Sequence, residues 1–314
     1  MLSFDKGNII GYFDGDKKSS LYHEKLYIYQ PKKIDEKPHI ITVDKNELIK
    51  YYVDHLPKLS YSEKKLLIKS IQTKTIPSLP KLEEYYVNAK GKIEDLEKKQ
   101  LSVPDDDNSK FEVLPDLKKH NTLTVFGKSG SGKSYFVSQW CKEARKQNPK
   151  IPIYLISRVD EDEAFDKGFE PKIKRVTIDD EIVSQPLEPT DFPEGSIIIC
   201  DDYAMIADLK RRKSIKDFVN KVLETGRHYK LTAICIFHKA LGGRDTMALH
   251  SESTLTVLFP RANENECEKY LKNYMSFNKD QLDLVKDISK KSRWVAITND
   301  YPTVLMCEKL IKIL

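Results

Sequence analysis

The chain has few of the residues that would indicate a disulfide-linked, zinc-binding or membrane-embedded protein. Its five cysteines are odd in number and scattered, and none forms a C-x-x-C pair, which argues against a disulfide framework and a zinc site. No apolar run approaches the ~20 residues that cross a bilayer, and the start of the chain carries charges where a signal peptide needs an apolar stretch. We therefore expect a soluble intracellular protein with reduced cysteines and no membrane partner.

Arginine is absent before Arg145, so the first hundred residues use only lysine for positive charge. The formal net charge of +5, from 53 basic and 48 acidic side chains, is a weak sign of a nucleic-acid partner, because most such groups solvate the surface. A guanidinium is a planar, permanently charged fork that suits phosphate better than an ammonium group does. The arginines of the later part of the chain are therefore better candidates for phosphate contacts than the lysines.

Glycine is also scarce, yet three of the 12 glycines stand together in the stretch TVFGKSGSGKSYF, residues 124–136. This stretch fits the G-x-x-x-x-G-K-S pattern of a phosphate loop, whose backbone N–H groups cradle a polyphosphate. An apolar run precedes the loop and a helical pattern follows it, which is the required order of strand, loop and helix. We expect Lys133 to reach the β and γ phosphates of ATP and Ser134 to hold Mg²⁺. The predicted nucleotide-binding residues are Gly127, Lys128, Ser129, Gly130, Ser131, Gly132, Lys133, Ser134 and Tyr135.

Apolar runs alternate with helical segments through the second part of the chain. Runs rich in isoleucine and valine that are separated by helices are typical of a parallel sheet covered on both faces. We therefore predict an α/β fold with a central, mostly parallel sheet. The strand candidates are residues 122–126, 151–157, 196–200, 231–237, 254–259, 293–298 and 303–307.

The first part of the chain carries no catalytic pattern. Residues 8–18 and 25–30 resemble two strands around a turn, and residues 46–71 have a helical pattern that Pro57 interrupts. Residues 102–110, SVPDDDNSK, have the proline, aspartate and asparagine content of a linker. We place the domain boundary in this linker. Residues 1–108 would form a smaller N-terminal domain of unknown role, and residues 109–314 a P-loop ATPase domain.

Two pairs of neighbouring aspartates are candidates for the catalytic half of the site. ATP hydrolysis needs one carboxylate that holds the water shell of Mg²⁺ and another that orients the attacking water. Asp201 and Asp202 end an isoleucine-rich run, so we expect Asp201 to face magnesium and Asp202 to act in catalysis; a plain turn is the alternative. Asp179 and Asp180 follow a shorter run that contains basic residues, and we rank this pair lower.

The segment that follows supplies further candidates. His238 ends the next apolar run, where it would sense the γ phosphate; the alternative is a partly buried histidine with a backbone partner. Arg227 follows a helix that we expect to begin with a capping box at Ser214 and to end at Gly226. Arg227 is either an arginine finger for the neighbouring subunit, which would require an oligomer, or a compensating charge for the helix dipole. A basic run either contacts the DNA backbone or solvates the start of the helix, and it consists of Lys210, Arg211, Arg212 and Lys213.

From about Leu117 to the C-terminus the chain resembles the FtsK-HerA superfamily of DNA-pumping ATPases. Within that superfamily it is most similar to the genome-packaging ATPases of poxvirus-type large DNA viruses and virophages. The resemblance rests on GKSGSGKS, IIICDD and GRHYKLTAICIFH, of which the third is the most specific. The superfamily usually has glutamate at the position of Asp202 and often glutamine at that of His238, so turnover by the shorter acid is expected to be slow or to need a partner.

The resemblance implies a RecA-like sheet that uses ATP with Mg²⁺. It also implies a homo-oligomeric ring of five or six subunits around double-stranded DNA, which loads a genome into a preformed capsid. Partners would include proteins of the capsid portal vertex, and the location would be cytoplasmic sites of viral replication and assembly, or the virion. By position, Lys133 would bind phosphate, Asp202 would be the catalytic acid, Arg227 the finger and His238 the sensor. Magnesium would be held by Ser134 and Asp201.

Three other functions stay open at this point. The nearest is another motor of the same superfamily, for conjugation or segregation. A small-molecule or nucleoside kinase usually begins near its phosphate loop and carries an arginine-rich lid, whereas Gly127 lies far into this chain. In a nucleotide-dependent scaffold, ATP would only order a binding surface. Hydrolysis stimulated by DNA would exclude the scaffold, and phosphate transfer to a nucleoside would favour the kinase.

Overall fold

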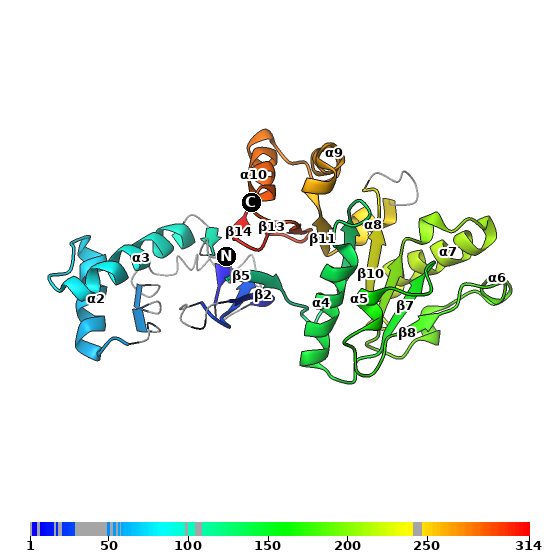
Figure 1. The fold of residues 1–314 in the computed structure, drawn as a ribbon, viewed down its shortest axis with the longest axis horizontal. Helices are drawn as coiled ribbons and strands as arrows, with labels where there is room; N and C mark the ends of the chain where they lie inside the picture. Colours follow the sequence, from blue (N-terminus) through cyan, green and yellow to red (C-terminus); the bar gives the residue numbers. More distant parts are fainter. Residues whose placement is uncertain are drawn as a thin grey trace, which may run out of the picture. The chain divides into compact units, whose positions relative to one another are not determined.

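The structure is a computed structural model that describes residues 2–4, 7–15, 17, 21–28, 49–50, 53–54, 56, 58–97, 100–103, 109–240 and 247–314. The chain divides into two compact units (Figure 1). The first contains Met1–Glu112 and Glu308–Ile313, and the second contains Val113–Cys307 and Leu314. The domain boundary expected at residue 108 lies in residues 104–108, outside the described residues. Residues 308–313 lie in the first unit, which the sequence did not predict.

The first unit contains a small sheet whose strands are β1 (Leu2–Ser3), β2 (Asn8–Asp14), β3 (Lys25–Ile28) and β5 (Lys110–Val113), in the order β1-β3-β2-β5. β2 and β3 pair antiparallel, as expected for the two strands around a turn. Glycine is required at position 11 of β2, because a Cβ there would lie 2.0 Å from Phe111 Cζ. A further strand, β4 (Gln100–Ser102), pairs antiparallel with β14 (Leu310–Ile313).

The same unit contains a helical hairpin made of α2 (Tyr61–Thr73) and α3 (Pro80–Glu97). Ser60 and Glu63 form a capping box at the start of α2, in which the Ser60 N–H donates to the Glu63 carboxylate at 2.7 Å. The two helices bury Leu67, Leu82 and other apolar side chains in a core of their own. The second half of the helical pattern at residues 46–71 is thus part of α2.

The second unit is built on a sheet with the strand order β13-β12-β11-β6-β10-β9-β7-β8. All seven expected apolar runs form strands, and the short segment β8 adds one more. The pairs from β11 to β8 are parallel, whereas β12 and β13 run antiparallel to their neighbours. The strands are β6 (Thr122–Phe126), β7 (Ile153–Ser157), β8 (Lys174–Val176), β9 (Ile197–Asp201), β10 (Thr232–Phe237), β11 (Leu255–Leu258), β12 (Val295–Thr298) and β13 (Val304–Met306). The predicted α/β fold with a mostly parallel central sheet is confirmed.

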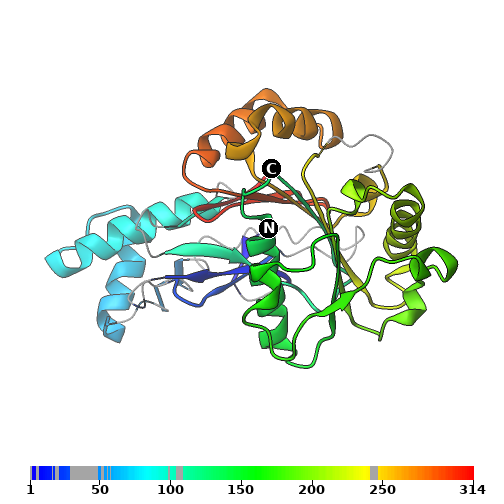
Figure 2. The same cartoon turned by 45° about the vertical axis from the view of Figure 1, so that its right-hand side comes forward.

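Helices cover both faces of this sheet. The crossover from β6 to β7 contains α4 (Lys133–Gln147), and the crossover from β9 to β10 contains α7 (Leu209–Thr225). The two crossovers run in opposite directions along the sheet, so their right-handedness places α4 and α7 on opposite faces. Figure 2 shows this arrangement. The remaining helices are α5 (Glu163–Asp166), α6 (Glu181–Ser184), α8 (Met247–Glu252), α9 (Glu264–Tyr274) and α10 (Lys279–Ser289).

One helix start differs from the expectation. α7 begins at Leu209, where the Asp208 carboxylate accepts a hydrogen bond from the Arg211 N–H at 2.8 Å. The capping box expected at Ser214 is wrong, because the Ser214 hydroxyl lies within the helix and donates to the Ile182 carbonyl of α6.

All five cysteines are free and buried. Within the described ranges, no helix is long and apolar enough to cross a membrane.

Candidate nucleotide-binding site

The candidate site lies where the carboxyl ends of four parallel strands meet. Phe126 at the end of β6 pairs with Phe237 at the end of β10, and Asp201 at the end of β9 pairs with Ile236. Ser157, which ends β7, pairs with Asp201 from the other side. Because parallel strands bring their carboxyl ends to one edge of a sheet, the segments after them surround one cavity of 390 Å³.

The phosphate loop joins β6 to α4 and contains glycines that a larger residue would not replace without strain. A Cβ at Gly127 would lie 2.6 Å from Ser131 Oγ and 3.0 Å from Phe259 Cβ, so a larger residue would displace the loop. Gly132 has a φ of 104°, a left-handed conformation that favours glycine, and α4 begins at the next residue, Lys133. The loop therefore leads directly into the N-terminus of a helix, where free N–H groups and the helix dipole favour phosphate.

Lys133 provides a buried positive charge on the loop side of the cavity. Only 7% of its surface is exposed. Its ammonium group donates to the carbonyl oxygens of Gly127 at 2.7 Å and Lys128 at 3.2 Å. Burial lowers the pKa of Lys133, whereas the negative charges of Asp202 and Asp201 raise it. Phosphate oxygens can replace the two carbonyl partners without moving the lysine to another part of the site.

Asp201 and Asp202 follow one another but have different surroundings. The Asp201 carboxylate accepts a hydrogen bond from the Ser157 hydroxyl at 3.1 Å. Burial raises the pKa of Asp201, and the negative charge of Asp202 also raises it, while the hydrogen bond from Ser157 acts in the opposite direction. Asp202 has φ and ψ of 52° and 33°, a left-handed conformation that is uncommon for non-glycine residues and concentrated at functional sites. The turn at Asp202 gives the two carboxylates different partners.

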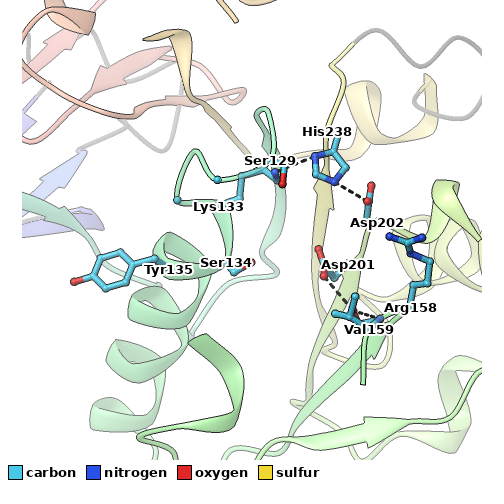
Figure 3. Close-up of a pocket in the computed structure, with 12 residues that line it drawn as sticks. Ser129, Lys133, Ser134, Tyr135, Arg158, Val159, Asp201, Asp202 and His238 are labelled. Carbon is cyan, nitrogen blue, oxygen red and sulfur yellow. Dashed lines mark hydrogen bonds and ion pairs between the residues drawn. The ribbon is translucent and has the colours of Figure 1, made fainter. Parts of the chain in front are cut away.

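His238, directly after β10, connects the two sides of the cavity (Figure 3). Its Nε2 lies 2.7 Å from Asp202 Oδ2, and its Nδ1 lies 3.4 Å from the Lys133 ammonium. The ring therefore contacts the candidate catalytic carboxylate and the phosphate-loop lysine at once. Both partners of His238 are side chains of the site. The alternative expected from the sequence was a histidine that bonds to the backbone.

The other predicted loop residues contribute in different ways. Ser129, Gly130 and Ser134 line the cavity. Tyr135 also lines it, is 64% exposed, and points away from the two carboxylates (Figure 3). The Ser131 hydroxyl is buried within the loop. The structure thus brings the predicted loop, Asp201, Asp202 and His238 together around one cavity.

The segment after β7 also lines the cavity, which the sequence did not predict. Ser157, Arg158 and Val159 supply this wall. The one local signal was the serine that ends an otherwise apolar run. Its partnership with Asp201 depends on the parallel pairing of β7 with β9, and pairing over such a distance leaves no local pattern.

Arg227 lies at the opposite edge of the sheet. It is exposed in the turn after α7, which the Leu231 N–H closes by donating to the Gly226 carbonyl at 2.9 Å. Burial lowers the pKa of His120, just before β6, and the nearby charge of Arg227 lowers it further. The five residues of β6 then separate this edge from the phosphate loop by roughly 16 Å, which is longer than an arginine side chain. Arg227 therefore does not reach the cavity of its own chain.

The basic run at the start of α7 contains two arginines with partners in the described part of the chain and two exposed lysines. Two bonds join the Arg211 guanidinium to Asp180, at 2.7 and 3.1 Å, and Arg212 donates to the Ala204 carbonyl at 3.3 Å. Of the four, Lys210 and Lys213 are exposed and the two arginines are partly buried. The physical reason is that α7 brings Arg211 beside the second aspartate pair, which was ranked lower for catalysis. All four side chains stay candidates for DNA contacts, and the two lysines are the ones whose side chains have no hydrogen bond or ion pair within the described residues.

These positions give a direct prediction for the two aspartate pairs. We expect Asp202→Asn to bind ATP with little change and to hydrolyse it at least about tenfold more slowly, because the attacking water loses its orienting carboxylate. Asp180→Asn removes only an exposed ion pair with Arg211, so turnover should stay within about twofold. Steady-state ATPase rates and the Kd of a non-hydrolysable analogue check both variants. The opposite ranking would move catalysis to Asp180.

The residues of the cavity fit a magnesium ion. The Ser134 hydroxyl and the Asp201 carboxylate both line it, and oxygen ligands are those that Mg²⁺ prefers. Within the described part of the chain, no group of three or more His, Cys, Asp and Glu side chains could hold a metal by itself. Mg²⁺ commonly binds through one or two protein groups and completes its shell with phosphate oxygens and water, so Ser134 and Asp201 could hold it.

Comparisons with known proteins find similarity to two viral proteins and to a conjugation coupling protein. No protein-family model matches it. It is 29% identical over 231 residues to the uncharacterized protein V3 of Sputnik virophage, which covers 73% of this chain and 89% of that protein. Among solved structures it is similar to the genome packaging NTPase B204 of Sulfolobus turreted icosahedral virus 2 in complex with ATP-gammaS, with 16% identity and a TM-score of 0.41. That similarity covers 64% of this chain and 100% of the NTPase. It is also similar to the pCW3 conjugation coupling protein TcpA, with 12% identity, 69% of this chain, 65% of TcpA and a TM-score of 0.40.

Proposed function

We propose that this RecA-like P-loop ATPase is a DNA-pumping motor of the FtsK-HerA type that packages a viral genome into a capsid. One observation carries the proposal: a complete phosphate loop faces two neighbouring carboxylates, and His238 connects the two sides of the cavity. Hydrolysis needs one carboxylate for the magnesium water shell and another for the attacking water, and Asp201 and Asp202 both line the cavity. This arrangement supports hydrolysis by water.

The loop residues, the two carboxylates and the histidine each have a role in that reaction. ATP binds with its phosphates in the loop, and Lys133 exchanges the carbonyls of Gly127 and Lys128 for phosphate oxygens. When bound at Ser134 and Asp201, Mg²⁺ supplies positive charge that neutralises the phosphates. Asp202 orients the attacking water and takes up its proton. The γ phosphate competes with Asp202 for His238, so the histidine reports whether ATP or ADP is bound.

DNA and packaging enter the proposal from the sequence. The motif GRHYKLTAICIFH carries the likeness to DNA-pumping ATPases, and the relative from Sputnik virophage favours packaging over conjugation or segregation. We further propose a homo-oligomeric ring of five or six subunits, proteins of the portal vertex as partners, and a location at cytoplasmic viral assembly sites.

The test of the function is ATP hydrolysis by the full chain with and without double-stranded DNA. We expect DNA of any sequence to stimulate turnover, and the chain to translocate along DNA and displace a labelled third strand. Turnover that ignores DNA would contradict the motor. Transfer of phosphate to a nucleoside instead of water would establish a kinase.

DNA binding itself should depend on salt rather than on sequence. Lys210 and Lys213 lie one helical turn apart on α7 and are exposed, so each can release counterions by contacting a phosphate. Replacing both with alanine should reduce the slope of log K against log salt by about 1 to 2. Fluorescence anisotropy over a salt series measures this slope. Lys269 and Lys272 have the same spacing on α9 and serve as the matched control. An equal effect of the control pair, or a strong sequence preference, would contradict this interface.

A further inference from the structure

The cavity contains a cationic side chain to which the proposed reaction assigns no role. Arg158 follows β7, is exposed, and lines the cavity. It lies on the same side as Asp201 and Asp202, across from the phosphate loop (Figure 3). Among the residues that the structure describes, none forms a hydrogen bond or ion pair with its guanidinium. The arginines nearby are committed, since Arg175 binds a carboxylate and Arg212 a carbonyl.

The backbone around Arg158 is held in place, although its side chain has no partner among the described residues. On one side, the Ser157 hydroxyl donates to Asp201 and accepts from the Val159 N–H at 3.3 Å. On the other side, the Val159 carbonyl accepts from Arg175 Nη1 at 2.9 Å. Arg175 is itself fixed by Asp166, whose two carboxylate oxygens accept from Nη2 at 2.8 and 3.0 Å. An anchored backbone with an uncommitted guanidinium is the arrangement expected of a residue that waits for a ligand.

The charges of the cavity indicate which ligand. Lys133 faces the phosphates from the loop, whereas Asp201 and Asp202 present negative charge from the opposite wall. During phosphoryl transfer, charge spreads over the equatorial oxygens of the γ phosphate, and those that face the carboxylates need a cation on that side. A guanidinium offers several N–H groups in a planar fork that matches two phosphate oxygens. Among the described residues that line this wall, Arg158 is the cation that can pair with these oxygens.

We infer that Arg158 binds the γ phosphate of ATP in its own subunit and stabilises the charge that develops there during hydrolysis. This inference rests on the proposed function. In the reaction, a water oxygen bonds to the γ phosphorus as the bond to the β–γ bridging oxygen breaks. ADP leaves with that electron pair, and Asp202 takes the proton of the water. Arg158 exchanges no proton and acts only by charge and hydrogen bonding. It differs from Arg227, which lies at the far edge of the sheet.

The first test uses binding and needs no turnover. ADP and ADP with aluminium fluoride, which mimics the transferred phosphoryl group, are titrated by calorimetry against the wild-type chain and the variants Arg158→Ala and Arg158→Lys. We expect Arg158→Ala to bind ADP within about threefold of the wild type and to lose about 10²-fold in affinity for the fluoride complex. Arg158→Lys should recover only part of this loss, because it keeps the charge but not the fork. Equal losses for both ligands, or no loss, would overturn the inference.

The second test separates a residue that acts in its own subunit from one that acts in the neighbour. Arg158→Ala should lower kcat by about 10²-fold with little change in KM, while Arg293→Ala, an exposed arginine outside the cavity, should leave both unchanged. Mixed rings of Arg158→Ala and Asp202→Asn should stay inactive, because no cavity then holds both groups. Recovery in such rings would place Arg158 in the neighbour's site and overturn the assignment. If the wild-type chain does not hydrolyse ATP, the proposed function fails, and the binding test still decides the role of Arg158.

Discussion

A Lys133→Ala variant will lose ATP hydrolysis by at least about 10³-fold, because no other described cation lies on the loop side of the cavity. The ammonium group is already within 3.2 Å of two loop carbonyls, so it needs little movement to reach the β and γ phosphates. Removing it leaves the negative charge of the phosphates without a partner in the same place where Asp201 and Asp202 repel them. We therefore expect weaker ATP binding in addition to lost turnover.

Three measurements check this result. ATPase rates and the Kd of a fluorescent ATP analogue report the site, and circular dichroism with a thermal melt reports the fold. Lys150→Ala removes an exposed lysine beyond the end of α4 and should behave as the wild type in all three. A Lys133→Ala protein that is folded and turns over at the wild-type rate would exclude this cavity as the ATPase site.

The parts of the site that were predictable from sequence are those carried by short, continuous segments. The phosphate loop needs a strand, a glycine-rich bend and a helix in immediate succession, and all three lie between Thr122 and Gln147. Asp201 and Asp202 at the end of β9 and His238 after β10 each follow a buried, mostly apolar run. Because parallel strands place their carboxyl ends at one edge, the sequence also predicted that these groups would meet.

The parts that were not predictable depend on pairing between distant segments. Arg211 binds Asp180 across 31 positions of sequence, so its charge looked free in the linear run. Serine is a common helix-capping residue, but the cap of α7 is Asp208, which lies six positions earlier. The Ser214 hydroxyl instead donates to a carbonyl of α6. Arg158 resembled an ordinary loop residue until β7 was paired beside β9.

The position of Arg227 leads to the second large effect. It lies at the amino edge of β10, about one strand length from the cavity of its own subunit, in an exposed turn. A head-to-tail ring brings a different face of each neighbour to every site, so such a turn can reach the next subunit's cavity. An arginine supplied in this way accelerates hydrolysis by about 10³ to 10⁵. We therefore expect Arg227→Ala to retain ATP binding and to lose almost all turnover. The turnover of the wild-type chain should rise faster than linearly with protein concentration.

Mixing two inactive proteins decides whether Arg227 acts between subunits. In rings of Arg227→Ala and Asp202→Asn subunits at equal amounts, about a quarter of the interfaces pair an intact Asp202 with an intact Arg227 from the neighbour, so that share of activity should return. Lys230→Ala is the matched control, because it removes a positive charge from the same turn, where Lys230 already pairs with Glu194. The Lys230→Ala protein should hydrolyse ATP at the wild-type rate without a second variant. Co-assembled mixed rings without recovery would show that Arg227 does not serve a neighbouring site. Arg158→Ala should fail to complement Asp202→Asn in the same assay, so the two arginines give opposite results only if one acts within its subunit and the other across the interface.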